Sequence, residues 1–368
     1  MLLVKYVKSD LGGIIMDGEL KRYSGIDLTK FICSFFVIMG HVPPFGVHNS
    51  SNIYTMLNFG LTQYICRLAV PFFFICNGYF LFRKIDFANP DSNKIKSRIL
   101  KIIKLYIIWS AIYFPLSLTE LIKHEKGFIH RVLVYIRDFL FMGSYVHLWY
   151  INGLIIALFI IAICLKLNLR PKAILLVSLF LYLIGLLDDS YYGLMNWIPL
   201  LSKVFEVYNK YFVTTRNGVF IAFFFVSLGM FISVKKPQIT HKQSAVLFFI
   251  SMLLMLIETF FLKYYSIARG FDNCIFLVPS VFFFFNLSSS IELYDSEKCS
   301  RLGTMSRLIY YGHLWVSIVI LQLFDYLPEG LIATPLRFLM VVAITIMISL
   351  VVMKLSDMQR FKWLKKMY

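Results

Sequence analysis

Long apolar stretches separated by short polar segments run through this chain of 368 residues. A membrane-spanning helix needs about 20 mostly apolar residues, so each stretch of that length predicts one span. The predicted spans are 26–43, 64–82, 102–121, 148–165, 172–187, 217–233, 244–262, 275–290, 307–324 and 335–354. They are too long, and lack the polar alternation, for strands of a membrane barrel. The pattern therefore predicts an all-α fold, a polytopic membrane helix bundle of about ten transmembrane helices.

The composition points to the bilayer as the solvent of this chain. Hydrophobic residues make up 59% of it and charged residues only 15%, yet Lys and Arg outnumber Asp and Glu by 37 to 20. A soluble domain has roughly 45–50% apolar and about 25% charged residues. A basic nucleic-acid-binding protein would be rich in polar residues instead. The composition therefore excludes both classes, and no nucleic-acid partner is expected.

The basic residues predict the orientation of the bundle. If the spans alternate, 24 of the 37 Lys and Arg fall on the side that holds both ends, 9 on the other side and 4 within helices. Cytoplasmic loops carry this excess, so both termini are predicted to be cytoplasmic in a multi-pass protein of the cell (plasma) membrane. We divide the chain into a cytoplasmic N-terminal segment (1–24), a ten-helix membrane domain (25–356) and a basic cytoplasmic tail (357–368). Translation starts at either Met1 or Met16.

The first predicted helix carries four polar side chains along one face. Lys30 and His41 are eleven residues apart, which is three helical turns plus about 20°, and about 16 Å along the axis. Asp27, Ser34 and His41 are spaced by seven residues and join the same face. Each residue alone is compatible with a place at the membrane interface. Because ionisable groups within a span are costly, their alignment favours a functional site.

Other polar or aromatic candidates lie within or beside the later spans: Arg67, Asn77, Arg98, Lys101, His147, Trp149, Arg216, Asn217 and His313. Arg98 and Lys101 have an ordinary explanation as charges at a cytoplasmic helix end, whereas Arg67 and Arg216 lie on the side that is poor in charge. A neutral His in a dry cavity can accept a proton from an alcohol. Basic groups at the cytoplasmic mouth suit a donor that carries phosphates.

Four segments of the sequence occur in the same order as similar segments of a known protein family. They are GIDLTKFICSFFVIMGH (Gly25–His41), RLAVPFFFICNGYFLF (Arg67–Phe82), HLWYINGLIIAL (His147–Leu158) and TRNGVFIAFFFVSLGMFI (Thr215–Ile232). Together they resemble the acyltransferase-3 family of integral-membrane O-acyltransferases, whose first helix has a basic residue, ten intervening residues and a His. The membrane half of the membrane-bound serine racemases is similar as well.

The resemblance implies roles for the candidate residues. His41 would be the catalytic base, and Asp27, at the matching place before the basic residue, would be a second catalytic residue. The acceptor would be a hydroxyl of a cell-surface carbohydrate or envelope precursor. The acyl donor, usually acetyl-CoA, would come from the cytoplasm and bind Lys30, Arg98 and Lys101. Many family members have arginine at the positions of Lys30 and Lys101. Lysine keeps the positive charge of arginine but lacks its bidentate fork. The supporting or substrate-binding residues would be Ser34, Arg67, Asn77, His147, Trp149, Arg216, Asn217 and His313.

Two other functions stay open, namely a transporter for a small metabolite such as serine and a structural or sensory membrane protein. No metal is expected, because the six cysteines lie mostly in apolar runs without the spacing of metal ligands. Substrate choice is expected in the loops 44–63, 122–146 and 188–216. The sequence does not define the acceptor, the acyl chain, the oligomeric state, or whether transfer is direct or passes through an acyl-enzyme.

Overall fold

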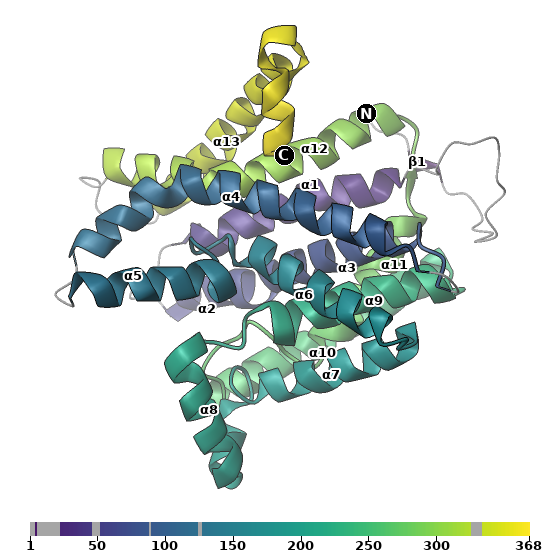
Figure 1. Ribbon diagram of the computed structural model, residues 1–368, viewed down its shortest axis with the longest axis vertical. Coiled ribbons are helices and arrows are strands. Elements are labelled where there is room, and N and C mark those ends of the chain that lie inside the picture. The colour runs from purple at the N-terminus through teal and green to yellow at the C-terminus, as the bar shows by residue number, and fades with distance from the viewer. Residues whose placement is uncertain (1–3, 6–22, 46–51, 88–89, 124–126, 325–332) are drawn as a thin grey trace.

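The computed structural model describes residues 4–5, 23–45, 52–87, 90–123, 127–324 and 333–368. Most of the described chain is helical, and many helices run side by side (Figure 1). The helices are α1 (Ser24–His41), α2 (Asn52–Gln63), α3 (Ala69–Phe82), α4 (Ser92–Lys123), α5 (Phe128–Arg137), α6 (Trp149–Lys166), α7 (Pro171–Leu186), α8 (Pro199–Phe212), α9 (Phe223–Lys235), α10 (His241–Tyr264), α11 (Leu277–Ser290), α12 (Ser296–Leu323) and α13 (Ala333–Asp357). Shorter helical turns are η1 (Ile65–Leu68), η2 (Asp138–Met142), η3 (Tyr192–Trp197), η4 (Gly218–Ala222) and η5 (Gln359–Met367).

Each of the ten predicted spans overlaps a helix of the structure, so the all-α class is confirmed. Six helices of the described chain are long and apolar enough to cross a membrane: Ile53–Phe82, Ser92–Thr119, Trp149–Lys166, Gly218–Lys235, His241–Tyr264 and Thr334–Asp357. Pro171–Leu186 and Leu277–Ser290 are apolar but shorter. The count of ten and the orientation of the termini therefore stay predictions.

Several segments have more structure than expected. The predicted loops 122–146 and 188–216 contain the helices α5 and α8. The predicted loop 44–63 is helical from Asn52, because the Phe59 ring packs edge-on against Phe260 and Phe271, with centroid distances of 5.6 and 5.0 Å. The N-terminal segment contributes β1 (Val4–Lys5), which pairs antiparallel with β2 (Glu292–Leu293) between α11 and α12.

Local signals explain several helix starts. Pro171 and Pro199 occupy the first turns of α7 and α8, where a proline removes no helical hydrogen bond. Thr240 and Gln243 form a reciprocal capping box at the start of α10. On its outer side α10 exposes large apolar side chains such as Phe249, which suit contact with lipid.

Helices α3 and α9 touch backbone to backbone. An added Cβ at Gly78 would lie 2.1 Å from the Val226 carbonyl oxygen, and one at Gly229 would lie 2.2 Å from that of Ile75. Such distances are impossible for real side chains, so only glycine permits this approach, as is common between membrane helices. The segments that precede α3 and α9 are therefore held next to each other.

We expect Gly78→Ala to destabilise the protein by about 1–3 kcal/mol, because its methyl group would push against the main chain of α9 rather than against a movable side chain. Thermal unfolding in detergent measures this as a lower Tm. The matched control is Gly60→Ala in α2, where nothing lies within 4 Å of an added Cβ. Equal Tm values for the two variants would contradict a tight contact between α3 and α9.

Candidate functional site

Three histidines from distant parts of the chain meet at the C-terminal end of α1. The ring centroids of His41 and His313 are 5.3 Å apart, and those of His313 and His147 are 5.4 Å apart. His41 ends α1, His147 precedes α6 and His313 lies inside α12. We call these residues the histidine cluster. The structure therefore brings together three of the predicted site residues.

The nitrogens of the histidine cluster differ in their hydrogen bonds. His313 Nδ1 lies 2.8 Å from the Tyr310 carbonyl oxygen, and since a carbonyl only accepts, Nδ1 carries the proton. Its Nε2, and both ring nitrogens of His147, have no hydrogen-bond partner in the described part of the chain. Tyr310 donates its hydroxyl hydrogen to the His147 carbonyl, and the Tyr113 ring packs against His147 at 4.6 Å. The His147 and His313 rings are thus fixed by their neighbours, and three of their ring nitrogens are buried without a partner in the described part of the chain.

A cavity of about 1230 Å³ opens at the other end of α1. Predicted residues on its wall are Asp27, Lys30, Asn77, Arg98 and Lys101. Nine basic residues line it against two acidic ones, namely Lys30, Lys84, Lys94, Arg98, Lys101, Lys104, Arg307, Lys365 and Lys366 against Asp27 and Asp91. We call it the cationic cavity. Its charge suits a ligand with several phosphates.

Hydrogen bonds position the predicted residues of the cationic cavity. Arg98 donates to Asn77 Oδ1 at 2.8 Å, and Asn77 Nδ2 donates to the Tyr150 hydroxyl at 2.8 Å. Lys30 pairs with Asp27 at 3.1 Å. Asp27 therefore lies with the cationic residues, roughly 21 Å along α1 from His41 by helical rise.

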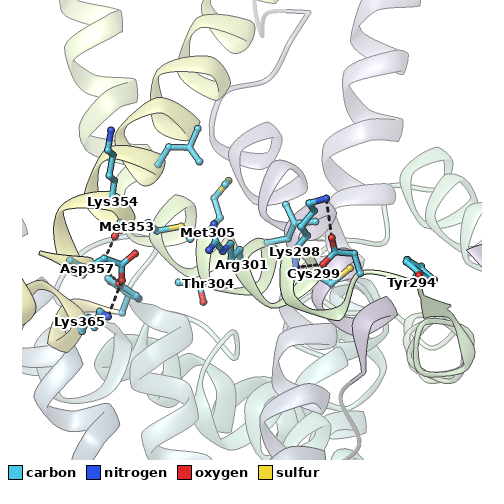
Figure 2. Close-up of a pocket in the computed structure, with 15 residues that line it drawn as sticks. Tyr294, Lys298, Cys299, Arg301, Thr304, Met305, Met353, Lys354, Asp357 and Lys365 are labelled. Carbon is cyan, nitrogen blue, oxygen red and sulfur yellow. Dashed lines mark hydrogen bonds and ion pairs between the residues drawn. The ribbon is translucent and has the colours of Figure 1, made fainter. Parts of the chain in front are cut away.

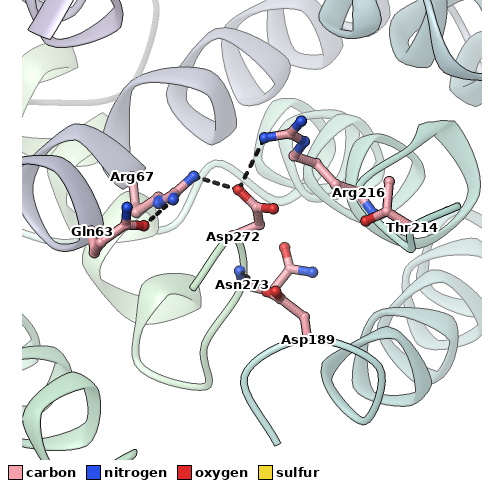
Figure 3. Close-up of polar contacts among 7 residues, drawn as sticks. All are labelled: Gln63, Arg67, Asp189, Thr214, Arg216, Asp272 and Asn273. Carbon is pink, nitrogen blue, oxygen red and sulfur yellow. Dashed lines mark hydrogen bonds and ion pairs between the residues drawn. The ribbon is translucent and has the colours of Figure 1, made fainter. Parts of the chain in front are cut away.

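A second charged group, drawn in Figure 3, lies near His41. Arg67 and Arg216 both donate to Oδ1 of Asp272, the latter at 3.3 Å, and Arg67 also donates to Gln63. The Arg216 guanidinium lies 5.4 Å from the Trp149 ring centroid. Both arginine charges act on the His41 ring. We call Arg67, Arg216 and Asp272 the arginine cluster.

Two predicted supporting residues have structural contacts instead. The Ser34 hydroxyl is buried and donates to the Phe31 carbonyl within its own helix, at 2.6 Å. Asn217 caps η4, because its Oδ1 accepts from the backbone N–H groups of Val219 and Phe220. Neither residue lines the cationic cavity.

Sequence reasoning missed Arg307, Tyr310 and Asp272. Arg307 and Tyr310 line the cationic cavity from α12. The sequence pointed to them because they precede His313 by six and three residues on the same helix. Asp272 is the counter-ion of two arginines. Its signal was an acidic residue in a predicted outer loop, on the same predicted side as Arg67 and Arg216.

Another cavity, of about 1220 Å³, lies between α12, α13 and η5 (Figure 2). Lys298 and Lys365 on its wall pair with Asp295 and Asp357, at 2.9 and 3.0 Å. No predicted site residue lines this cavity, so it is separate from the candidate site apart from shared wall residues such as Tyr368.

The fold and the site define a helical membrane protein with a charged cavity and a histidine cluster. Residues 23–354 match the family model of an acyltransferase domain, so the chain belongs to the acyltransferase-3 family. It is 29% identical to an "Amino-acid racemase" of Enterococcus faecalis, over 91% of this chain and 46% of that protein. It is 28% identical to a "Serine/alanine racemase" of Enterococcus gallinarum, over 79% of this chain and 40% of that protein. The chain thus spans less than half the length of these curated relatives. No solved structure is significantly similar to it.

Asp189 and Asp272 lie close together in loops and differ in pKa. Burial, and then the charge of Asp272, raise the pKa of Asp189 from 3.8 to about 7. Burial alone would raise the pKa of Asp272 too, but the charges of Arg67 and Arg216 outweigh it and lower that pKa. Asp272 is therefore the more fully charged member of the pair at neutral pH.

Asp189 makes the stability of the protein depend on pH. Its folded-state pKa is higher than that of the unfolded chain, so between about pH 4 and 7 the folded state binds more protons and loses stability as the pH rises. The slope is at most about 1.4 kcal/mol per pH unit. We expect Asp189→Asn, which keeps an oxygen acceptor for the Asn273 backbone N–H, to flatten the decline of Tm between pH 5 and 7. Identical Tm slopes for the variant and the wild type would contradict this pKa.

Proposed function

We propose that this protein is a membrane O-acyltransferase of the cell envelope. In this proposal it transfers an acyl group, most simply acetyl, from cytoplasmic acetyl-CoA to a hydroxyl of a carbohydrate or envelope precursor outside the plasma membrane. The observation that carries the proposal is that α1 connects the two halves of the site. Lys30 faces the cationic cavity, and His41 lies in the histidine cluster about 16 Å further along the helix.

The cationic cavity suits the nucleotide end of the donor. Its Lys and Arg side chains pair with phosphates, and Arg98 is held for this by Asn77. The inner wall includes Tyr310, whose ring lies 5.6 Å from His147 and 6.3 Å from His313. The wall between the cavity and the histidine cluster is thus a single ring thick at this point. The extended arm of a coenzyme A thioester reaches toward His41 past this wall.

The proposed chemistry is a single acyl transfer. The acceptor hydroxyl gives its proton to His41 as its oxygen attacks the acyl carbon. The C–S bond of the thioester then breaks, and the departing thiolate takes the proton from His41. One ester bond forms, one thioester bond breaks, and nothing is oxidised or reduced. His313 and His147 place two further titratable rings beside the base, while Asp27 acts at the donor end through Lys30.

One other candidate is the transport of a small metabolite such as serine, an amino acid that the name of one relative, a "Serine/alanine racemase", contains. The polar path along α1 is compatible with it. Uptake of labelled serine into vesicles without acetyl-CoA would support transport. Acetylation of envelope glycan that depends on His41, without such uptake, would contradict it.

We expect His41→Gln to lower acyl transfer about 10²- to 10⁴-fold, because the reaction loses its general base. The measurement is the transfer of labelled acetyl from acetyl-CoA to envelope glycan in membranes with equal amounts of protein. The matched control is His130→Gln, which changes an exposed histidine of α5 and should transfer like the wild type. Undiminished acetyl content in the His41 variant would overturn the proposed function.

The donor half of the site has its own test. We expect Arg98→Gln to raise KM for acetyl-CoA up to about 10-fold with little change in kcat, because an exposed arginine loses its charge-assisted contact to phosphate. Lys96→Gln is the control, since Lys96 is exposed on the same helix but does not line the cavity. Equal KM values for both variants would exclude the cationic cavity as the donor site.

A further inference from the structure

The arginine cluster holds one positive charge more than its partners neutralise. Arg67 and Arg216 share a single carboxylate, that of Asp272, and both donate to the same oxygen, Oδ1 (Figure 3). The neighbouring carboxyl group of Asp189 is only partly ionised near neutral pH, because burial and the charge of Asp272 raise its pKa to about 7. A partly buried excess charge of this kind favours an anion.

The cluster also has hydrogen-bonding groups without partners. The Nε of Arg67 is buried and unpaired among the described residues. Arg216 makes one side-chain hydrogen bond there, through a single terminal nitrogen, and leaves the rest of its planar fork unused. Asn273 is only 1% exposed, and neither atom of its amide has a partner in the described chain. Figure 3 shows this amide between the carboxyl groups of Asp272 and Asp189. Leaving buried polar groups unpaired in this way costs free energy. A bound ligand that hydrogen-bonds with these groups would remove that cost.

The position of the cluster associates it with the acceptor rather than with the donor. The charges of Arg67 and Arg216 act on the His41 ring. Arg216 lies over Trp149, two residues after His147, so the cluster adjoins the histidine cluster. The donor phosphates have the cationic cavity, which opens at the opposite end of α1.

We propose that the arginine cluster binds a singly charged oxyanion on the acceptor, a carboxylate carried by the same molecule as the reacting hydroxyl. This inference rests on the proposed function, because it names the class of acceptor that would reach His41. A single excess charge matches a carboxylate better than a doubly charged phosphomonoester. The fork of Arg216 supplies the bidentate geometry that carboxylates prefer. A sugar acid and a hydroxy amino acid share this chemistry.

The test is direct binding to the purified full chain in detergent, measured by calorimetry. The probes are glucuronic acid, L-serine and the neutral sugar N-acetylglucosamine. We expect at least one of the two carboxylates to bind, and Arg216→Gln to weaken it roughly 10- to 100-fold. Arg216→Lys should retain part of the affinity, because it keeps the charge without the fork. The matched control is Arg269→Gln, which removes an outer-loop arginine that pairs with Asp188 and should leave binding unchanged.

The outcomes separate this inference from the proposed function. Which probe binds distinguishes a sugar acid from an amino acid as the source of the carboxylate. Carboxylate binding that Arg216→Gln leaves intact, or neutral sugar binding as tightly as either acid, would overturn the inference. His41→Gln should bind the carboxylate like the wild type while transferring no acyl group. Binding that depends on Arg216 in a protein without any acyl transfer would sustain the anion site and reject the transferase.

Discussion

The contact between the backbones of α3 and α9 at Gly78 and Gly229 is the constraint on which the site depends. With no side chain between them, the main chains themselves set the distance between the two helices. Arg67 lies in η1, two residues before α3, and Arg216 lies two residues before η4, which leads into α9; both arginines pair with Asp272. Asn77, the neighbour of Gly78, is held at the wall of the cationic cavity by its hydrogen bonds with Tyr150 of α6 and Arg98 of α4.

The features that could be predicted from the sequence are those that arise within one helix or from the bilayer. Apolar length located the helices, because lipid demands it of each span separately. The helical period placed Lys30 and His41 on one face of α1. The helical period could not show which hydrogen-bond partner each side chain of that face has. Ser34 lies on the predicted face, yet its hydroxyl bonds to its own helix at Phe31, and Asp27 pairs with Lys30.

The contacts that the sequence did not predict join residues far apart along the chain. His147 and His313 meet through the packing of α12 against the segment before α6, and no local pattern encodes that distance. Asp272 pairs with arginines 56 and 205 residues away. The capping contact of Asn217, in contrast, is local. An Asn just before a helix is an N-cap signal, so this role could be predicted from the sequence.

A layer of aromatic side chains lies between the cationic cavity and the arginine cluster. It explains how the proposed reaction joins substrates from the two sides of the membrane without an open path for ions. Around the histidine cluster the side chains are rings, with Tyr113, Tyr310 and Trp315 packed on or next to the imidazoles. The side chains of Tyr113, Tyr310 and Trp315 carry no charge that could pair with an ion. In the proposed reaction the phosphates of the donor stay in the cationic cavity, and the anion of the acceptor stays at the arginine cluster. Because only the uncharged acyl group and the thioester arm that carries it have to enter this layer, neither charged substrate needs to cross the bilayer.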